Sequence, residues 1–554
     1  MAMADLVFTG GTVRVSGQRT ADAVAISGNR IGAVGSSAEV AELIGPGTEV
    51  VELADRAVLP GFVDAHVHPT HGGMSLIRCD LRGAGSAPEA VARVARYAQE
   101  NPDQLWITGG GWELSWFAGG VPHRSLLDAV VPDRPVYLPN RDAHGAWVNS
   151  RALELSGVDA GTSDPADGRI ERDPDGSPQG TLHEGATRLV ADAMPAPTFD
   201  DRVAALLAGQ AYLHSMGVTG WQDAIVGDYL GWLDPLDVYL ATAESGRLTG
   251  RVVGALWWDR DRGGEQIDDL LARRERAGGP AGTGRFRAGS VKIMQDGVAE
   301  NFTAAMVMPY LVVDRHGGGT GLSYVDPAAL RGYAVTLDAA GFQLHFHAIG
   351  DRAIRESLDA IAACRDTNGH TDTRPHIAHL QVIQPADVPR FGALGAAATM
   401  QALWAYHEPQ LDELTIPYLG PERTEWQYPF GSLQASGAHL AAGSDWPVTT
   451  ANPFHALQVA VTRLPPPGEG GSGAAEPFLP VQRLDLATAF DAYTIGSAYV
   501  NHAEQDTGSI EAGKLADLVV VDRDPFAGPD AEVGDVRVLA TYVDGAQVFT
   551  DPSW

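Results

Sequence analysis

Strand-like apolar runs alternate with amphipathic segments through the middle of the chain. Short apolar runs predict buried strands, whereas apolar positions that recur every three or four residues predict helices. The strand-like runs lie at 217–221, 251–258, 290–294, 343–346, 375–380 and 439–442, and the helical segments include 200–215, 266–277, 327–340 and 351–364. Repeated strand–helix units predict a parallel α/β fold, and eight of them would close a TIM-type (β/α)8 barrel.

The two ends of the chain have a different pattern. Residues 5–58 contain short β-type runs between Gly and Asn turns, which predict a small antiparallel sheet. Similar runs return between residues 508 and 549. We therefore expect one β domain built from residues 1–60 plus 505–554, flanking a barrel domain at 61–504.

Two segments interrupt the strand–helix pattern. Residues 100–190 are rich in Gly, Pro and Trp and contain short β-like pieces, which indicates an insertion over the mouth of the barrel. Residues 465–477 join a Pro-rich stretch to a Gly-rich one, a composition typical of a surface loop.

The first candidate metal ligands end the apolar run at 58–65, where His66 and His68 follow each other two residues apart. Side chains at i and i+2 of a strand leave the same face, so the two imidazoles point together. Neutral imidazole is the commonest protein ligand for zinc and related ions. The alternative is a pair of histidines held by hydrogen bonds near a strand end.

Four further candidates end strand-like runs of their own: Lys292, His347, His379 and Asp445. The active sites of barrels lie where the parallel strands end, so these side chains and the paired imidazoles outline one metal centre. His347 and His379 are preferred to His345 and His376 because they lie nearer the loops.

Asp445 and Lys292 each have an alternative interpretation. An unpaired carboxylate after a small-residue strand favours a cation as its partner, but Asp445 can also cap the segment that follows Pro447. Lys292 lies within an apolar run, where lysine is rarely found without a partner or a chemical reason. A salt bridge to Asp296 is the alternative for Lys292.

Composition narrows the class of protein. A chain of 554 residues with an apolar fraction of 44% is globular and long enough for two or more structural units. The net charge of -31 argues against nucleic acid and anionic membranes as partners, although it is equally explained by an acidic solvated surface. Two cysteines, no signal peptide and no apolar run of about 20 residues predict a cytoplasmic protein.

Several motifs together resemble the amidohydrolase superfamily, and more closely its YtcJ-like branch, which includes N-substituted formamide deformylases. They are Leu-Pro-Gly-Phe-Val-Asp-Ala-His-Val-His at 59–68, Val-Lys-Ile-Met-Gln-Asp-Gly at 291–297, His-Ala-Ile-Gly-Asp-Arg-Ala at 347–353, His-Ile-Ala-His-Leu-Gln at 376–381 and Ala-Gly-Ser-Asp-Trp-Pro at 442–447. The resemblance covers nearly the whole chain, including 141–149 in the insertion and 513–521 near the C-terminus.

The resemblance implies a (β/α)8 barrel with a composite β-sandwich and one or two divalent ions, zinc or alternatively manganese or cobalt. His66 and His68 would bind the more buried ion, and Lys292 would bridge two ions as an N-carboxylated side chain. His347 and His379 would hold the second ion. Asp445 would act as a ligand and as the catalytic group that moves protons. Barrels of this kind often pair, so a homodimer is one expected state.

The chemistry of such a site predicts hydrolysis of an amide-type C–N bond in a small molecule, an N-acyl or N-formyl compound with apolar or aromatic character. Predicted substrate contacts are Trp112, His144, Asp296 and Trp404, with His183, Glu184 and His407 as weaker candidates. Two other functions stay open. One is a different reaction on the same scaffold, such as deamination, decarboxylation, or ester or carbamate hydrolysis; the other is a non-catalytic barrel.

Overall fold

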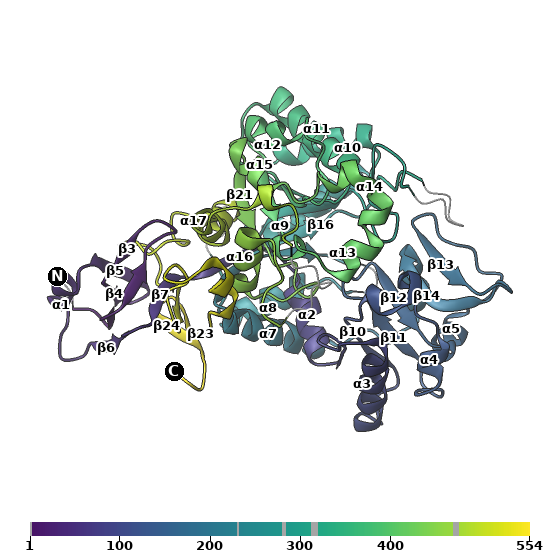
Figure 1. Ribbon diagram of the computed structural model, residues 1–554, viewed down its shortest axis with the longest axis horizontal. Coiled ribbons are helices and arrows are strands. Elements are labelled where there is room, and N and C mark those ends of the chain that lie inside the picture. Colours follow the sequence, from purple (N-terminus) through teal and green to yellow (C-terminus); the bar gives the residue numbers. More distant parts are fainter. Residues whose placement is uncertain (1–2, 230–231, 280–283, 312–318, 469–475) are drawn as a thin grey trace.

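The computed structural model describes residues 3–229, 232–279, 284–311, 319–468 and 476–554 (Figure 1). Residues 469–475 of the surface loop expected at 465–477 lie outside this part of the chain. Among the described residues, no helix combines the length and apolar composition needed to cross a lipid bilayer.

A sheet of eight parallel strands forms the centre of the molecule, and the predicted TIM-type barrel is confirmed. In order around the sheet the strands are β8 (Phe62–Val67), β15 (Val218–Val226), β16 (Arg251–Trp257), β17 (Phe286–Met294), β18 (Gln343–Ala348), β19 (His376–His379), β20 (Ala397–Met400) and β21 (His439–Ala442). Most of their residues are buried, as expected for parallel strands covered on both faces.

Amphipathic helices follow the barrel strands on the outside. They include α7 (Phe199–Ser215), α9 (Ile267–Arg276), α10 (Pro327–Ala339) and α11 (Asp351–Asn368). α7 begins at a capping box in which Thr198 and Asp201 satisfy each other's backbone N–H groups. α10 begins at Asp326, whose side chain accepts hydrogen bonds from two N–H groups of the first turn.

The barrel is joined at the boundary between its first and last strands, β8 and β21, which we call the closing seam. Just beyond β21, the Asp445 N–H donates to the His66 carbonyl at 2.8 Å, and the His68 N–H donates to the Trp446 carbonyl at 2.9 Å. The segment that carries two predicted ligands therefore also closes the barrel.

Strands from both ends of the chain build two further sheets. One contains β1 (Leu6–Thr9), β4 (Ala23–Ser27), β5 (Arg30–Gly35) and β6 (Glu49–Glu52). The other contains β2 (Thr12–Arg14), β3 (Thr20–Ala21) and β7 (Ala57–Pro60) with β22 (Leu518–Val521), β23 (Val538–Val543) and β24 (Ala546–Thr550). Residues of both sheets, such as Phe8, Val24, Leu518 and Tyr542, share one hydrophobic core, so the two sheets form a sandwich.

The expectation of a single antiparallel N-terminal sheet was wrong in two respects. The strands divide between two sheets, and β1 pairs in parallel with β6 while β2 pairs in parallel with β7. Parallel neighbours need a long connection. Here the intervening strands and the short helix α1 (Ser37–Ala41) supply the connection between β1 and β6.

A sheet of six strands is inserted between β8 and β15. It contains β9 (Cys79–Asp80), β10 (Ile107–Gly110), β11 (Val136–Pro139), β12 (Gly145–Val148), β14 (Pro178–Glu184) and β13 (Gly168–Arg172). This sheet begins before residue 100, where we expected the insertion to start, because β9 has only two residues and carries no recognisable strand pattern.

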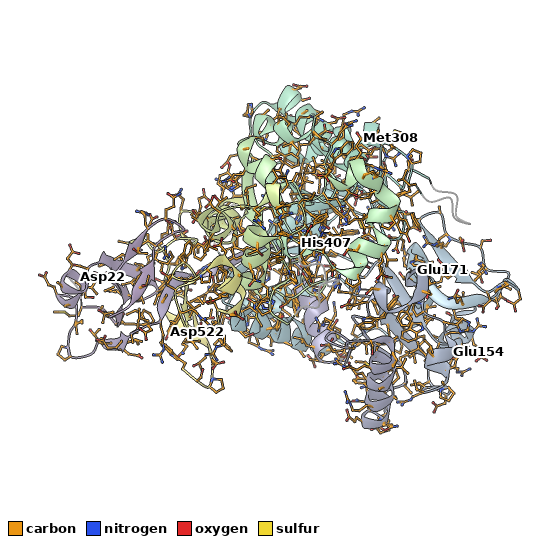
Figure 2. The ribbon with its side chains drawn as sticks, viewed as in Figure 1. Asp22, Glu154, Glu171, Met308, His407 and Asp522 are labelled. Atoms are coloured by element: carbon orange, nitrogen blue, oxygen red, sulfur yellow. The ribbon has the colours of Figure 1, made fainter. Side chains whose placement is uncertain are left out.

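The sandwich and the insertion lie at opposite ends of the molecule, with the barrel between them (Figure 1). Figure 2 shows the labelled Asp22 and Asp522, from the two ends of the chain, in the same part of the molecule, and Glu154 and Glu171 at the other end. Of these two parts, the insertion lies beside the carboxyl ends of the barrel strands, because its residues 139–144 line the same cavity as the predicted ligands.

Candidate metal centre

One cavity at the carboxyl ends of the barrel strands collects all the predicted metal ligands. His66, His68, Lys292, His347, His379 and Asp445 line it together. They come from β8, β17, β18, β19 and the segments that follow β8 and β21. Because parallel strands end at the same edge, residues far apart in the sequence meet here.

His66, His379 and Asp445 form the tightest group. One potential ligand atom from each lies within 4.8 Å of the others. The distance from His66 Nε2 to Asp445 Oδ1 is 3.2 Å, and that from His379 Nδ1 to Asp445 Oδ2 is 4.0 Å. His68 donates from Nε2 to Asp445 Oδ1 at 2.9 Å, and the rings of His347 and His379 lie 4.3 Å apart between centroids.

The buried nitrogens of this group fit a divalent cation. His66 Nε2 and both ring nitrogens of His379 lack a hydrogen-bond partner among the described residues. A buried polar atom without a partner costs about 1–3 kcal/mol, so leaving several unpaired at one point would be unfavourable. An ion coordinated by these nitrogens removes that cost.

The protonation states also fit a cation. Burial lowers the pKa of His66, His347 and His379 well below the usual value, and nearby Lys292 lowers each further, so the rings are neutral, as metal ligands must be. Burial alone would raise the pKa of Asp445, but the hydrogen bond from His68 and the charge of Lys292 help to lower it below its usual value. The carboxylate of Asp445 is therefore ionised, as a metal ligand must be.

Lys292 is buried within the same group. Burial lowers the pKa of its amine to about 7, although Asp445 and Asp223 act in the opposite direction. A large fraction of the amine is therefore uncharged at neutral pH, which is unusual for lysine.

Hydrogen bonds behind the cavity fix the ligand rings. His66 Nδ1 and His345 Nε2 are 2.8 Å apart, so the deeper histidine of β18 orients a ligand of β8. A partner of this kind holds an imidazole in one orientation and one tautomer. The backbone N–H of His379 donates to Gln401 Oε1 at 2.6 Å, which fixes the main chain at the end of β19.

Asp64 ties the two sides of the closing seam together. Its carboxylate accepts hydrogen bonds from the Ser444 hydroxyl at 2.5 Å, the Ser444 N–H at 3.0 Å and the His66 N–H at 3.0 Å. Burial raises the pKa of Asp64 to about 7. The sequence reasoning missed both residues as supporting groups, although Asp64 and Ser444 lie inside the motifs that carry His66 and Asp445.

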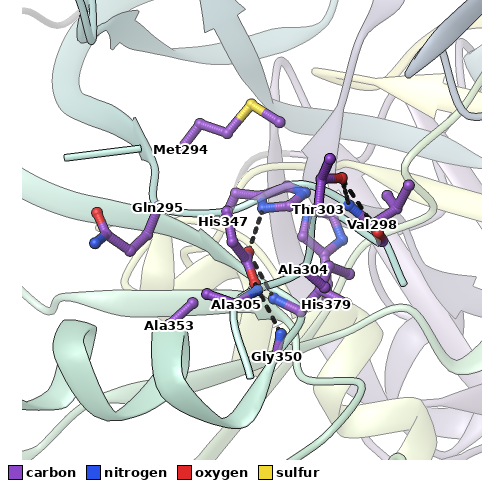
Figure 3. Close-up of polar contacts among 12 residues, drawn as sticks. Met294, Gln295, Val298, Thr303, Ala304, Ala305, His347, Gly350, Ala353 and His379 are labelled. Carbon is purple, nitrogen blue, oxygen red and sulfur yellow. Dashed lines mark hydrogen bonds and ion pairs between the residues drawn. The ribbon is translucent and has the colours of Figure 1, made fainter. Parts of the chain in front are cut away.

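Asp296 does not face substrate as expected. Its carboxylate accepts hydrogen bonds from the N–H groups of Ala305, Ile349 and Gly350 at 2.8–3.0 Å, and lies 3.2 Å from His347 Nδ1 (Figure 3). Both oxygens are thus occupied, and Asp296 does not line the cavity. Its position beside His347 makes it a positioning residue, which a strand-end pattern cannot distinguish from a contact residue.

Trp112 also lies outside the cavity, contrary to expectation. Its indole N–H donates to the Leu138 carbonyl at 2.7 Å, and its ring packs against Phe117 and Trp147 in the core of the insertion. A tryptophan in a hydrophobic segment serves packing as readily as binding. Trp404, by contrast, lines the cavity and stacks on His379, with ring centroids 5.3 Å apart and planes 2° from parallel.

His144 reaches the cavity from the insertion and carries a positive charge. Its Nδ1 donates to both oxygens of Glu184 at 3.0 Å, and the Thr303 hydroxyl donates to Glu184 Oε1 at 2.8 Å. Burial opposes protonation of the ring, but the charge and hydrogen bonds of Glu184 prevail and raise the pKa of His144 to about 9. The cavity therefore holds an imidazolium opposite neutral histidines.

Backbone conformations confirm that this region is under constraint. His379 (φ 81°), Leu380 (φ 57°), Asp445 (φ 55°) and Glu184 (φ 50°) all lie in the left-handed region. Non-glycine residues adopt it at a cost and cluster at functional sites. His379 and Asp445 are predicted ligands and Glu184 is the His144 partner, whereas other residues with positive φ, such as Ala54 and Asp544, lie in turns of the sandwich.

Comparisons with known proteins agree with this geometry. A model of the amidohydrolase family matches residues 49–549. The chain is 33% identical to Protein LONG AFTER FAR-RED 3 of Arabidopsis thaliana over 99% of this chain and 92% of that protein. It is 29% identical to N-substituted formamide deformylase of Arthrobacter pascens over 98% of each. A solved structure, an uncharacterized metal-dependent hydrolase from Pyrococcus furiosus, matches with a TM-score of 0.69 and 26% identity over 94% of this chain and 99% of that chain.

Proposed function

The chain belongs to the amidohydrolase family, and from this premise we propose that it is a zinc-dependent hydrolase that cleaves the amide-type C–N bond of an N-acyl or N-formyl small molecule. The observation that carries the proposal is the convergence of His66, His379 and Asp445 within 4.8 Å, with imidazole nitrogens that lack other partners. The deformylase relative supports the choice of bond.

The proposed ligands are His66, His68, His347, His379, Asp445 and an N-carboxylated Lys292. When bound, a divalent metal ion acts as a Lewis acid and makes water reactive at neutral pH. Carboxylation of Lys292 would form a bond between Nζ and the carbon of CO2 and release one proton. The neutral amine that burial produces at Lys292 is the form able to react. The product is a carbamate, which is an anion. Carboxylation would therefore remove the positive charge that a protonated Lys292 places beside the neutral histidines.

The chain's own groups complete the reaction. Asp445 accepts the proton of the attacking water and passes it to the leaving nitrogen, since its carboxylate is ionised and faces the cavity. His144 donates a charge-assisted hydrogen bond that orients a polar group of the substrate. Trp257, Trp404 and Met294 give the cavity an apolar wall, which favours a substrate that is apolar beside the scissile bond.

The test of this function is turnover by the purified protein loaded with zinc, cobalt or manganese. N-formyl, N-acyl, ester and carbamate substrates of graded aromatic bulk are compared, with product analysis to detect deamination. We expect hydrolysis of the N-formyl or N-acyl compounds. Exclusive ester, carbamate or deaminase activity would replace the proposed reaction. No turnover with less than one equivalent of bound metal would indicate a non-catalytic barrel.

Replacing Asp445 by Asn tests its role as the proton carrier. Because general acid–base catalysis contributes about 10²–10⁴-fold, we expect kcat to fall by that factor. Most of the metal stays bound, because an amide oxygen still coordinates, and metal analysis checks this. The matched control is Asp22→Asn on the exposed surface of the sandwich. Wild-type activity in Asp445→Asn would refute the assigned role.

A further inference from the structure

A second and larger cavity adjoins the metal centre. The cavity around the predicted ligands has a volume of about 90 Å³, whereas its neighbour has a volume of about 530 Å³. Pockets that bury small-molecule ligands usually measure about 300–1,000 Å³. The space at the metal centre therefore accommodates a reacting group, but not a substituent of aromatic size.

The two cavities share part of their lining. His71, Ser75, Gly109, Pro139 and Trp232 face both. His71 stacks on Trp232 with ring centroids 4.3 Å apart, and on its other side lies 5.8 Å from the ring of His68. The stacked rings of His71 and Trp232 thus border both cavities, next to the predicted metal ligand His68.

The larger cavity is lined by segments that belong to different parts of the fold. α2 (Pro69–Leu76) contributes Met74, the insertion contributes Trp106, and the segment before α7 contributes Met194. Several polar groups of the wall are bound to protein groups: Arg78 Nη1 donates to Thr108 Oγ1 at 2.8 Å within the wall, Asp201 accepts from the Thr198 hydroxyl, and Arg202 donates to the Asp234 carbonyl. Large apolar side chains with occupied polar neighbours suit an uncharged aromatic or branched alkyl group.

We infer that the larger cavity binds the apolar arm of the same substrate molecule whose scissile bond lies at the metal centre. This inference rests on the proposed hydrolase function and specifies its substrate: a small acyl or amine group on one side of the bond and a bulky apolar group on the other. His71 and Trp232, which line both cavities, would lie beside the part of the substrate that joins its two ends.

The cavity rim offers a matched pair of variants. Ala196 lines the cavity and is exposed, whereas Ala193 is exposed three residues earlier and does not line it. Ala196→Trp therefore places a bulky ring at the rim without disturbing a core, and Ala193→Trp makes the same change beside it. Gln104→Trp, from another exposed segment of the rim, serves as a second obstructing variant.

The kinetic experiment compares N-methylformamide with N-(2-naphthylmethyl)formamide and N-methyl-2-naphthylacetamide, whose bulk lies on the nitrogen and the acyl side respectively. The measured quantity is kcat/KM for the better naphthyl substrate divided by kcat/KM for N-methylformamide. We expect this ratio to fall about tenfold in Ala196→Trp, because steric discrimination in apolar pockets is of this size. Ala193→Trp leaves this ratio unchanged. Equal ratios in both obstructing variants and the control overturn the inference.

A binding measurement separates this inference from the proposed reaction. The probe is N-(2-naphthylmethyl)methanesulfonamide, which lacks an acyl carbon, titrated calorimetrically into the purified protein. Binding that weakens about tenfold in Ala196→Trp and Gln104→Trp but not in Ala193→Trp supports the cavity even if no amide is hydrolysed. Equal affinity in all four proteins overturns the assignment, whatever the outcome of the turnover assays.

Discussion

At the residue scale, the charge of His144 depends on its buried partner. Burial lowers the pKa of His144, but Glu184, with Asp142 and Asp445, raises it to about 9, and the pKa of Glu184 itself falls to about 2. The stabilisation from the raised pKa of His144 is complete below about 6.5 and is lost as the pH rises through about 9. The stabilisation from the lowered pKa of Glu184 is lost only as the pH falls towards 2.

Replacing Glu184 by Gln tests this pair. In the wild-type protein we expect kcat/KM to decline as the pH rises through about 9, because His144 loses its proton. In Glu184→Gln the decline moves to lower pH, because burial still lowers the pKa of His144 and the Glu184 carboxylate no longer raises it. A pH profile of kcat/KM measures the shift, with Glu154→Gln on the exposed surface of the insertion as control. An unchanged profile would contradict the role of the ion pair.

The residues that meet in the cavity could largely be found from the sequence. Each of His66, His347 and Asp445 lies at or just beyond the end of a strand, and parallel strands bring their ends together whatever their separation along the chain. The hydrogen-bond partners of each side chain could not be predicted from its position at a strand end. Asp296 also follows a strand, yet three backbone N–H groups occupy its carboxylate, and only the folded loop reveals them.

At the scale of elements, the closing seam depends on the absence of a side chain at Gly443. A Cβ atom placed there would lie 2.6 Å from the His66 N atom and 2.7 Å from its Cβ atom. Both distances are far below van der Waals contact, and the obstacle includes backbone. The residue after β21 must therefore be glycine for β8 to approach.

Gly443→Ala should move His66 away from the other ligands. Overpacking of this kind costs about 1–3 kcal/mol, so we expect that decrease in the free energy of unfolding together with weaker metal retention. Denaturant titration and metal analysis measure the two effects. Gly289→Ala in β17 is the control, because its added Cβ atom would meet no atom within 4 Å. Full metal retention in Gly443→Ala would show that the seam tolerates the added methyl group.

The sequence predicted which segments form strands and helices better than it predicted which strands pair with each other. The barrel strands were recognisable because strand–helix alternation identifies a parallel sheet without further information. Short strands in the N-terminal region carried no information about which partner each would choose, so the parallel pairing of β1 with β6 was unexpected. β6 is a mostly exposed strand at the edge of its sheet, so its side chains form no buried pattern that would indicate its neighbour.

At the scale of the whole molecule, the sandwich requires both ends of the chain. β7 pairs with β22 along its length, and β22 pairs with β23. The sandwich also contacts the barrel, since Arg251 of β16 pairs with Asp517 at 2.7 Å and the Thr541 hydroxyl donates to the His214 carbonyl at 2.7 Å.

Deleting residues 505–554 should prevent folding of the whole chain rather than remove a separate domain. The deletion leaves β7 as an unpaired edge and exposes core residues such as Val58, and exposed edges of this kind promote aggregation. Soluble yield and circular dichroism, compared with the full-length chain, measure the effect. A soluble 1–504 fragment that retains metal would contradict this dependence.

The insertion leaves the barrel after β8 and returns before β15, and through His144 it reaches the reacting space. Among the described residues, the predicted metal ligands all come from the barrel, whereas this single contiguous segment supplies a cationic group and part of the walls. Changes confined to residues of this one segment would therefore alter which molecules fit the cavity while leaving every predicted metal ligand in place.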